Sequence, residues 1–176
     1  LDSKSFFYSK LDKFHRPRQI YKHILGTDTK DDVLIFEEKD DTFTCSINLS
    51  SDEKYFIVST SDHITTEEYF FSTNKNNNEL ILFNKREKDV QYTIDSWKGY
   101  FYIHTNKDAR DYKILRCKVN DIKNLEEFVP AKKNIVIGDL VFLDDYFLRV
   151  EKSDAIPKLY VRNIKNNKEE EIKISD

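Results

Sequence analysis

Serine, histidine and cysteine are the residue types here that can supply nucleophiles, general bases or metal ligands, so their spacing is considered first. A serine hydrolase needs a G-x-S-x-G elbow, in which a sharp strand-to-helix turn exposes the serine hydroxyl beside an oxyanion hole. Two positions after the three glycines, Gly26, Gly99 and Gly138, the chain has Asp28, Phe101 and Leu140. Because none of these residues is serine, the elbow is absent and we expect no catalytic residue in the chain.

The four histidines do not form the pattern of a metal site. No two of them have the i, i+4 spacing of a helical zinc site, and no H-E-x-x-H motif occurs. His23 and His104 lie within strand-like runs, where we expect solvated or hydrogen-bonded side chains. His15 and His63 lie near expected loops, and nothing around them supports a binding role. The histidines therefore predict neither a cofactor nor a metal.

The cysteines and the acidic or amide runs have simple structural interpretations. Cys45 and Cys117 are far apart in the sequence, so we expect two small buried side chains rather than a redox or zinc pair. Four polar runs fall between expected strands, where Asn and Asp supply turn conformations: residues 40–41, 76–78, 144–145 and 166–167. The D-x-D-x-D-G spacing of a calcium loop is missing.

Two pairs of charged residues remain as candidate binding groups. Glu37 and Glu38 can attract basic side chains of a peptide, but adjacent strand residues point to opposite faces, so at most one lines a given surface. We interpret both as the solvent-exposed end of an outer strand. Arg16 and Arg18 are two positions apart in a segment that Pro17 keeps out of a helix, so we expect them to share a face. Their expected partner is another domain, or water.

The composition favours a single β-rich domain with a real core. The 176 residues include 13 Phe and 10 Tyr, which pack well on half-buried pleated surfaces. The 29 Lys and Arg nearly balance the 32 Asp and Glu, so the chain lacks the basic footprint of a nucleic-acid binder. No apolar run approaches the ~18 residues of a membrane span. No signal peptide is visible, so we expect a cytoplasmic protein without membrane contact.

Short aromatic or β-branched runs alternate with polar turns along the whole chain, which is typical of all-β proteins. The expected strands form one group of three and three groups of four: 6–8, 20–24 and 33–36; 43–49, 55–60, 68–72 and 80–83; 91–95, 100–105, 112–119 and 125–129; 135–143, 146–151, 159–164 and 170–174. The groups recur roughly every 45 residues, the period of a four-stranded propeller blade. The groups share this pattern of strands and turns, but their residues are not obviously alike. We predict an all-β, partial β-propeller over residues 1–176, with about three whole four-stranded blades plus part of another, and blade breaks near 41, 88 and 133.

Three local patterns add detail to this prediction. Within residues 112–119 the apolar positions alternate with Arg116 and Lys118, so we expect a strand with its apolar side chains on one face. Trp97 falls in an expected turn, where we interpret it as a plug between blades rather than a substrate-stacking ring. Residues 123–128, KNLEEF, are expected to form a single helical turn if any helix exists.

Residues 16–43, RPRQIYKHILGTDTKDDVLIFEEKDDTF, resemble oligopeptidase B, a branch of the prolyl oligopeptidase family of serine peptidases. The likeness rests on Arg16-Pro17 and on residues 20–23, 25–27 and 35–41, and it continues through 55–59, 92–95, 100–106 and 129–134. In that family the region belongs to a β-propeller that covers the active site. The resemblance therefore implies a non-catalytic part of an enzyme, without the hydrolase domain. The chain has no methionine and begins at Leu1, so we expect a piece of a longer protein.

The resemblance also implies a function for the parent protein, which is hydrolysis of short peptides after Lys or Arg in the cytoplasm. The propeller is expected to cap the hydrolase domain of the same polypeptide and to restrict entry to small peptides. Because fold does not determine function, a propeller that binds proteins and has no part in proteolysis is the alternative. A G-x-S-x-G elbow encoded downstream would favour the peptidase, whereas a stop codon or another repeat array would favour the interaction module.

A partial propeller leaves two blade faces without a neighbour. We expect these faces to carry apolar residues from the runs 6–8 and 141–148. Apolar patches above a few hundred Å² rarely stay uncovered in soluble monomers, so we expect the chain to self-associate. The expected modes are a pair of like faces or a stack of unlike ends, and the closed pair is favoured over an open filament because pairing like faces ends growth.

Overall fold

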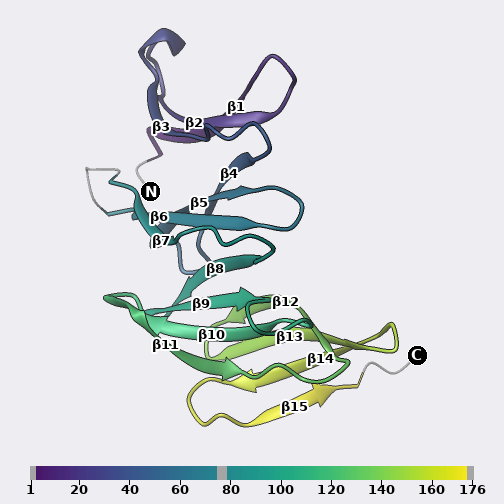
Figure 1. Cartoon of the computed structure of the whole chain (residues 1–176). Helices are drawn as coiled ribbons and strands as arrows, with labels where there is room; N and C mark the ends of the chain where they lie inside the picture. Colours follow the sequence, from purple (N-terminus) through teal and green to yellow (C-terminus); the bar gives the residue numbers. More distant parts are fainter. Residues whose placement is uncertain (1–2, 75–78, 174–176) are drawn as a thin grey trace.

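The chain folds into consecutive antiparallel β-sheets that lie face to face in chain order (Figure 1). This computed structural model describes residues 3–74 and 79–173. The described residues contain one single-turn 3-10 helix, η1 (Thr29–Asp31), in addition to the strands. No helix in this part of the chain has the length and apolar character needed to cross a membrane.

The strands form four sheets, which we number from the N-terminus. Sheet 1 contains β1 (Ser5–Leu11), β2 (Pro17–Ile24) and β3 (Val33–Glu37), and sheet 2 contains β4 (Thr44–Leu49), β5 (Tyr55–Ser61), β6 (Thr66–Ser72) and β7 (Ile81–Asn84). Sheet 3 contains β8 (Tyr92–Trp97), β9 (Tyr100–Thr105), β10 (Lys113–Lys118) and β11 (Asp121–Val129). Sheet 4 contains β12 (Val136–Leu143), β13 (Tyr146–Ser153), β14 (Ile156–Asn163) and β15 (Glu169–Ile172).

Each strand pairs with its neighbour in sequence, so every sheet is a meander. The predicted partial propeller of three whole blades plus part of another is confirmed, because three sheets have four strands and sheet 1 has three. The connections between sheets run through residues 38–43, 85–91 and 130–135, and positions 41, 88 and 133 lie within them. Strand β4 packs on β2 and β1 as β8 packs on β6 and β5, so β1, β2 and β3 correspond to the second, third and fourth strands of the other sheets.

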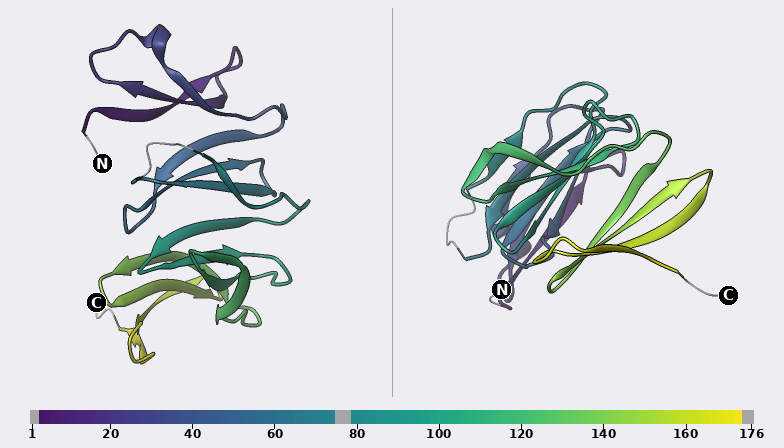
Figure 2. Two further views of the ribbon diagram at one scale, coloured as in Figure 1. Left: turned by 90° about the vertical axis from the view of Figure 1, so that its left-hand side faces the viewer. Right: turned by 90° about the horizontal axis from the view of Figure 1, so that it is seen from below.

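Apolar clusters fill the seams between successive sheets, and the interior sheets bury both faces. Cys117 belongs to the cluster between sheets 2 and 3, with Leu115 and Val119 packed against it, so the predicted alternation in this strand is confirmed. Ile114, three residues before Cys117 in β10, belongs to the cluster between sheets 3 and 4. Arg116 lies on that second face, with its guanidinium 4.9 Å from the ring centres of both Tyr100 and Phe128. Figure 2 shows the arrangement of the successive sheets from two further directions.

Two local predictions are corrected by the structure. The strand expected at 125–129 is confirmed as part of β11, and the helical turn considered for residues 123–128 does not form, because β11 pairs with β10 and Arg116 binds Glu126 across the strands at 2.5 Å. Trp97 is the last residue of β8 and does not lie in the turn that follows. Its expected role as a plug is confirmed, since its ring stacks on Phe142 of sheet 4 at 5.8 Å and its Nε1 donates to the Asp144 carbonyl at 2.9 Å.

The second strand of each complete sheet begins with the same dipeptide, which was not predicted as a repeat from the sequence. Strands β5, β9 and β13 all begin with Tyr-Phe. In each case the phenylalanine packs on the preceding sheet: Phe56 on Phe7 at 4.5 Å, Phe101 on Phe70 at 4.7 Å and Phe147 on Phe128 at 5.2 Å. The complete sheets therefore share identical residues at these two positions as well as the same strand pattern.

Asn and Asp supply many of the tight turns, as expected. Half of the non-glycine positive-φ residues described are of these types: Asp89, Asp108, Asn134, Asp144, Asp154 and Asn167. Asp40 serves its turn differently, since its carboxylate accepts from the Thr42 amide at 2.9 Å. Residues 76–78, for which a turn was also predicted, lie outside the described residues.

Candidate functional site

The histidines occupy structural positions. His23 on β2 places Nδ1 2.7 Å from Asp32 Oδ1, and His104 on β9 places Nε2 2.8 Å from the Ile137 carbonyl. Both were predicted as hydrogen-bonded strand residues, and this is confirmed. His15 takes a φ of +60° in the β1–β2 turn, and His63 is exposed in the turn between β5 and β6.

The cysteine thiols are buried and unreactive. Cys45 and Cys117 are each 2% exposed and form no disulfide, which confirms the predicted small buried side chains. Burial raises the pKa of each thiol to about 11, so neither supplies a thiolate near neutral pH. Within residues 3–74 and 79–173, no group of three or more His, Cys, Asp and Glu side chains is arranged to hold a metal ion.

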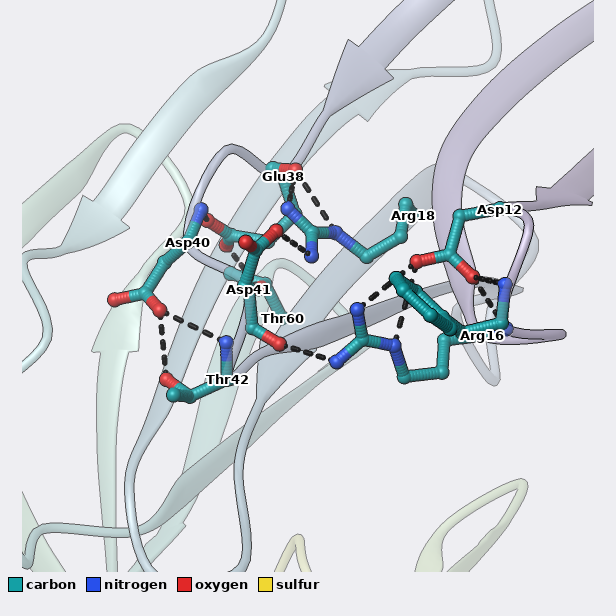
Figure 3. A network of polar contacts seen from close by, with 9 residues as sticks. Asp12, Arg16, Arg18, Glu38, Asp40, Asp41, Thr42 and Thr60 are labelled. Carbon is teal, nitrogen blue, oxygen red and sulfur yellow. Dashed lines mark hydrogen bonds and ion pairs between the residues drawn. The ribbon is translucent and has the colours of Figure 1, made fainter.

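A connected polar network lies where the chain crosses from sheet 1 to sheet 2 (Figure 3). The β1–β2 turn supplies Asp12 and Arg16, and β2 supplies Arg18. The connection at residues 38–43 supplies the acceptors, and β5 supplies Thr60 from sheet 2. We take this network and the cleft beside it as the candidate functional site.

Arg16 and Arg18 lie on the same side of the chain and both bind Asp41. Arg16 Nη1 donates to the Asp41 carbonyl at 2.6 Å, and Arg18 Nη1 donates to Asp41 Oδ1 at 2.8 Å. Arg18 also donates through Nε and Nη2 to the Glu38 carbonyl, at 3.1 and 2.6 Å. The predicted shared face is confirmed. Their expected partner was another domain or water, and the partner found is the connection of the same chain.

The two glutamates at the end of β3 have different environments. Glu37 is exposed and accepts from Gln19 Nε2 at 2.6 Å, so the expected solvent position is correct for this residue. The same expectation is wrong for Glu38, which is only 5% exposed. The strand ends at Glu37, and the chain then turns toward sheet 2, which directs the Glu38 carboxylate into the seam. There it accepts from Thr60 and from the Asp40 amide.

Arg86 completes this buried part of the network. Its Nη2 lies 2.7 Å from Glu38 Oε2 and 3.1 Å from Glu67 Oε1, and its guanidinium stacks 4.0 Å from the centre of the Phe43 ring. Burial opposes the ionisation of Glu38, but hydrogen bonds from Thr60 and the Asp40 amide, together with Arg86, outweigh it and lower the pKa. Both partners therefore stay charged at neutral pH, so the arrangement is an anchor and not a proton-transfer site.

A cleft of about 510 Å³ opens beside the network. It is lined by Asp12, Lys13, Phe14, Arg16, Arg18, Gln19, Glu37, Glu38 and Asp41. Four acids and three bases line it, and the arginines are already bound to carboxylate or carbonyl oxygens. The lining contains no serine, cysteine or histidine, so the cleft can bind or position polar groups but offers no hydroxyl, thiol or imidazole of these types for catalysis.

A second ion network lies within sheet 4 and was not anticipated from the sequence. Arg149 is 1% exposed and binds both oxygens of Glu169, at 2.6 and 2.8 Å, and Glu151 at 2.8 Å. Lys132 donates to Glu151 at 2.7 Å, and Arg162 donates to the Phe128 carbonyl of sheet 3 at 2.9 Å. Burial opposes ionisation of Glu169, but its two arginines outweigh it and lower the pKa to about 2. The sequence signal that could have revealed this network was Arg149 itself. It lies on the same face of β13 as buried Phe147, and on the opposite face from exposed Tyr146 and half-buried Leu148.

Comparison with known proteins places this fold in a family. The chain matches the prolyl oligopeptidase N-terminal β-propeller domain over residues 1–176. It is 31% identical to Protease 2 of Moraxella lacunata over 155 residues, which cover 88% of this chain and 22% of that protein. It is 26% identical to dipeptidyl aminopeptidase BI of Pseudoxanthomonas mexicana over 164 residues, 91% of this chain and 22% of that protein. The chain thus spans less than a quarter of the length of these relatives.

Solved structures agree with the fold. Oligopeptidase B from Leishmania major superposes with a TM-score of 0.93 at 18% identity, covering 99% of this chain and 26% of that one. Oligopeptidase B from Trypanosoma brucei superposes with a TM-score of 0.91 at 20% identity, with the same coverage. The resemblance found in the sequence is confirmed, and the chain belongs to the N-terminal β-propeller domain family of the prolyl oligopeptidases.

Proposed function

We propose that this chain is the non-catalytic propeller portion of an oligopeptidase B-like serine peptidase that hydrolyses short peptides after Lys or Arg in the cytoplasm. The observation that carries the proposal is the 31% identity to Protease 2 across 88% of the chain. The absence of a nucleophile elbow from the sequence agrees with it, because the chemistry must then be done by another part of the polypeptide.

The proposed role is steric selection. A propeller that caps the hydrolase domain of the same polypeptide admits short basic peptides and excludes folded proteins. A cap also keeps water from the reacting groups when it closes. This role requires blades that move as one unit. The anchors between sheets support it, since Glu38 and Arg86 tie the first connection to sheet 2 and Arg162 ties sheet 4 to sheet 3.

The deciding test is to read the open reading frame beyond Asp176 and then to assay the polypeptide that it encodes. A G-x-S-x-G elbow followed by Asp and His, and faster cleavage of an Arg-containing fluorogenic peptide than of a Pro-containing one, would support the proposal. A stop codon, or a further repeat array with no elbow after it, would reject it in favour of a protein-interaction module. Cleavage after Pro but not after Arg or Lys would reject the proposed specificity.

The proposed size restriction needs its own measurement. We expect the kcat/KM of the encoded polypeptide to fall steeply when the same cleavage sequence is placed in peptides of about 10 residues and in a folded protein. A propeller-free variant of the hydrolase part is the comparison. If the folded protein is cut as fast as the short peptide, the steric role is wrong.

A further inference from the structure

A hollow of about 530 Å³ lies on the face of sheet 3 that turns toward sheet 4, away from the network described above. Its floor is formed by Tyr100 of β9 and by Arg116 and Lys118 of β10, and its rim by residues 121 and 123–126 of β11. The floor side chains share one face, because Lys118 pairs with Tyr100 and Arg116 lies two positions before Lys118. The volume is within the range of small-molecule sites in proteins.

The rim of the hollow is an extended bulge in β11. The register of β11 against β10 shifts between Arg116 and Lys118, so residues 122–125 lie opposite Cys117 alone. Ile122 packs on the cluster between sheets 2 and 3, on the other side of the sheet, whereas the three residues after it line the hollow. Extra residues in one strand of a pair bend that strand and redirect its side chains. The hollow is therefore shaped by the local backbone of an outer strand.

Sheet 4 leaves this part of sheet 3 open. The described lining residues all lie between positions 100 and 126, within sheet 3. Figure 2 shows sheet 4, at the yellow end of the colour scale, turned away from the line of the three earlier sheets. The four-sheet arrangement recurs in the longer chain of oligopeptidase B from Leishmania major, which superposes over 99% of this chain with a TM-score of 0.93. The placement of sheet 4 that leaves the hollow open is therefore a property of the fold.

Arg116 is held firmly in the floor of the hollow. Its guanidinium lies 4.9 Å from the ring centres of both Tyr100 and Phe128, and its Nε donates to Glu126 at 2.5 Å. The side chain is 26% exposed, so these contacts fix the guanidinium while it still faces the hollow. A guanidinium that is already positioned loses little conformational freedom when it binds an anion.

The hollow carries more positive than negative charge. Three basic side chains line it against two acidic ones. The carboxylate of Asp121 already accepts from Asn124 Nδ2 at 2.6 Å, and the other carboxylate is the one bound to the guanidinium. Lys118 and Lys123 are exposed, and no carboxylate among the described residues forms an ion pair with either. The charge that lacks a partner in this hollow is therefore cationic, which favours an anionic ligand.

We propose that this hollow binds the phosphate group of a small phosphorylated molecule. The cations reach it from two strands, Arg116 and Lys118 from the floor and Lys123 from the rim. Phosphate oxygens point in several directions and can bind all three cations, whereas a carboxylate has two coplanar oxygens and suits a single guanidinium fork. Leu125, 43% exposed at the rim, offers an apolar surface to the organic part of the ligand. The site stands apart from the proposed peptidase function.

Isothermal titration with phenyl phosphate as the probe tests this site in the full polypeptide that carries residues 1–176. We expect saturable binding that Lys118→Gln and Lys123→Gln each weaken roughly two- to fivefold, as for the loss of one exposed ion pair. Lys88→Gln, an exposed lysine in the connection between β7 and β8, is the matched control and should leave the affinity unchanged. Far-UV circular dichroism checks that each variant is folded.

Two further ligands define what the site recognises. Inorganic phosphate that binds as tightly as phenyl phosphate would identify the free anion as the ligand, and weaker binding would identify a phosphate ester; both results agree with the proposal. Three results would overturn it. They are no saturable binding of either phosphate at millimolar concentrations, an affinity that Lys118→Gln and Lys123→Gln change no more than Lys88→Gln does, and benzoate that binds as tightly as phenyl phosphate.

Discussion

Substituting Glu68 with glutamine is expected to stabilise the chain at neutral pH. Glu68 lies on β6 and is 1% exposed in the seam between sheets 2 and 3. Its carboxylate accepts from Ser59 Oγ at 2.8 Å, and no cation faces it among the described groups. Nearby, the Tyr92 hydroxyl accepts from the Glu68 amide at 3.0 Å and donates to the Asn84 carbonyl. Burial raises the pKa of this carboxyl to about 8, and the Ser59 hydrogen bond offsets only part of that effect.

The repeat register supports the view that an acid is costly at this position. Glu68 pairs with the fifth residue of β5, and the fifth residues of β1, β9 and β13 pair with Ile20, Ile114 and Leu159. Ile20 and Ile114 are fully buried. Sheet 2 thus carries a carboxyl where the other three sheets carry an aliphatic side chain, so isoleucine should be tolerated there as well.

The sign and size of the effect follow from linkage. The folded pKa of about 8 exceeds the ordinary value of 4.5, so between these pH values the unfolded state loses a proton that the folded state keeps. Stability therefore falls as pH rises through this window, by about 1.4 kcal/mol per pH unit. The penalty amounts to roughly 3 kcal/mol at pH 7 and roughly 5 kcal/mol above pH 8, and glutamine, which does not ionise, removes it.

Urea denaturation at pH 5, 7 and 9 measures this prediction. The free energy of unfolding of Glu68→Gln should exceed that of the wild type by about 3 kcal/mol at pH 7, with a smaller gain at pH 5 and a larger one at pH 9. Glu127→Gln, an exposed residue of β11, is the matched control and should change little. A gain that is absent at pH 9, or that does not grow with pH, would refute the reasoning.

Three other outcomes are expected. Arg149→Ala should lower the free energy of unfolding by about 3–5 kcal/mol in urea titrations, because Glu151 and Glu169 lose their buried cation; a loss under about 1 kcal/mol would contradict this. Glu38→Gln should cost about 1–3 kcal/mol at pH 7. Because the pKa of Glu38 is lowered on folding, that difference should shrink as pH falls below about 4, and a constant difference would count against the ion pair. The chain alone should not cleave an Arg-containing fluorogenic peptide, and stoichiometric turnover blocked by a serine-directed phosphonate would disprove this.

Much of the fold could be predicted because aromatic and β-branched runs separated by Asn and Asp mark strands and turns directly. The strand expected at 125–129 is present within β11, but it was predicted too short, and the helical turn considered for residues 123–128 is wrong. These residues include good helix formers, but pairing with β10 outweighs the local preference of such a short segment. Trp97 was predicted to lie in a turn, but it is the last residue of β8. This error did not affect its predicted packing.

The candidate site was only partly predictable. The shared face of Arg16 and Arg18 follows from the two-residue period of an extended segment, so it could be read from the sequence. The burial of Glu38 depends on the direction in which the chain leaves β3, which no local pattern reports. The contacts of Arg149 with Glu169 join different strands of sheet 4, and they become visible only once the register of that sheet is known.

The sixth residue of the second strand explains why the repeat is hard to read in the sequence. In each complete sheet this residue bonds to the connection that leads into the sheet, but the chemistry differs. Thr60 donates to Glu38, Thr105 Oγ1 donates to the Gln91 carbonyl at 2.9 Å, and Glu151 accepts from Lys132 at 2.7 Å. The same mechanical role is thus filled by a hydroxyl on a carboxylate, a hydroxyl on a carbonyl and an ion pair. Because this residue holds the incoming connection, and any good hydrogen bond can do so, the residue type varies while the geometry is kept.

The second residue of the second strand behaves differently, since phenylalanine must fill a seam of fixed size against the preceding sheet. In these sheets the residue type is therefore repeated where packing fixes the side-chain volume, and it varies where a hydrogen bond fixes the contact.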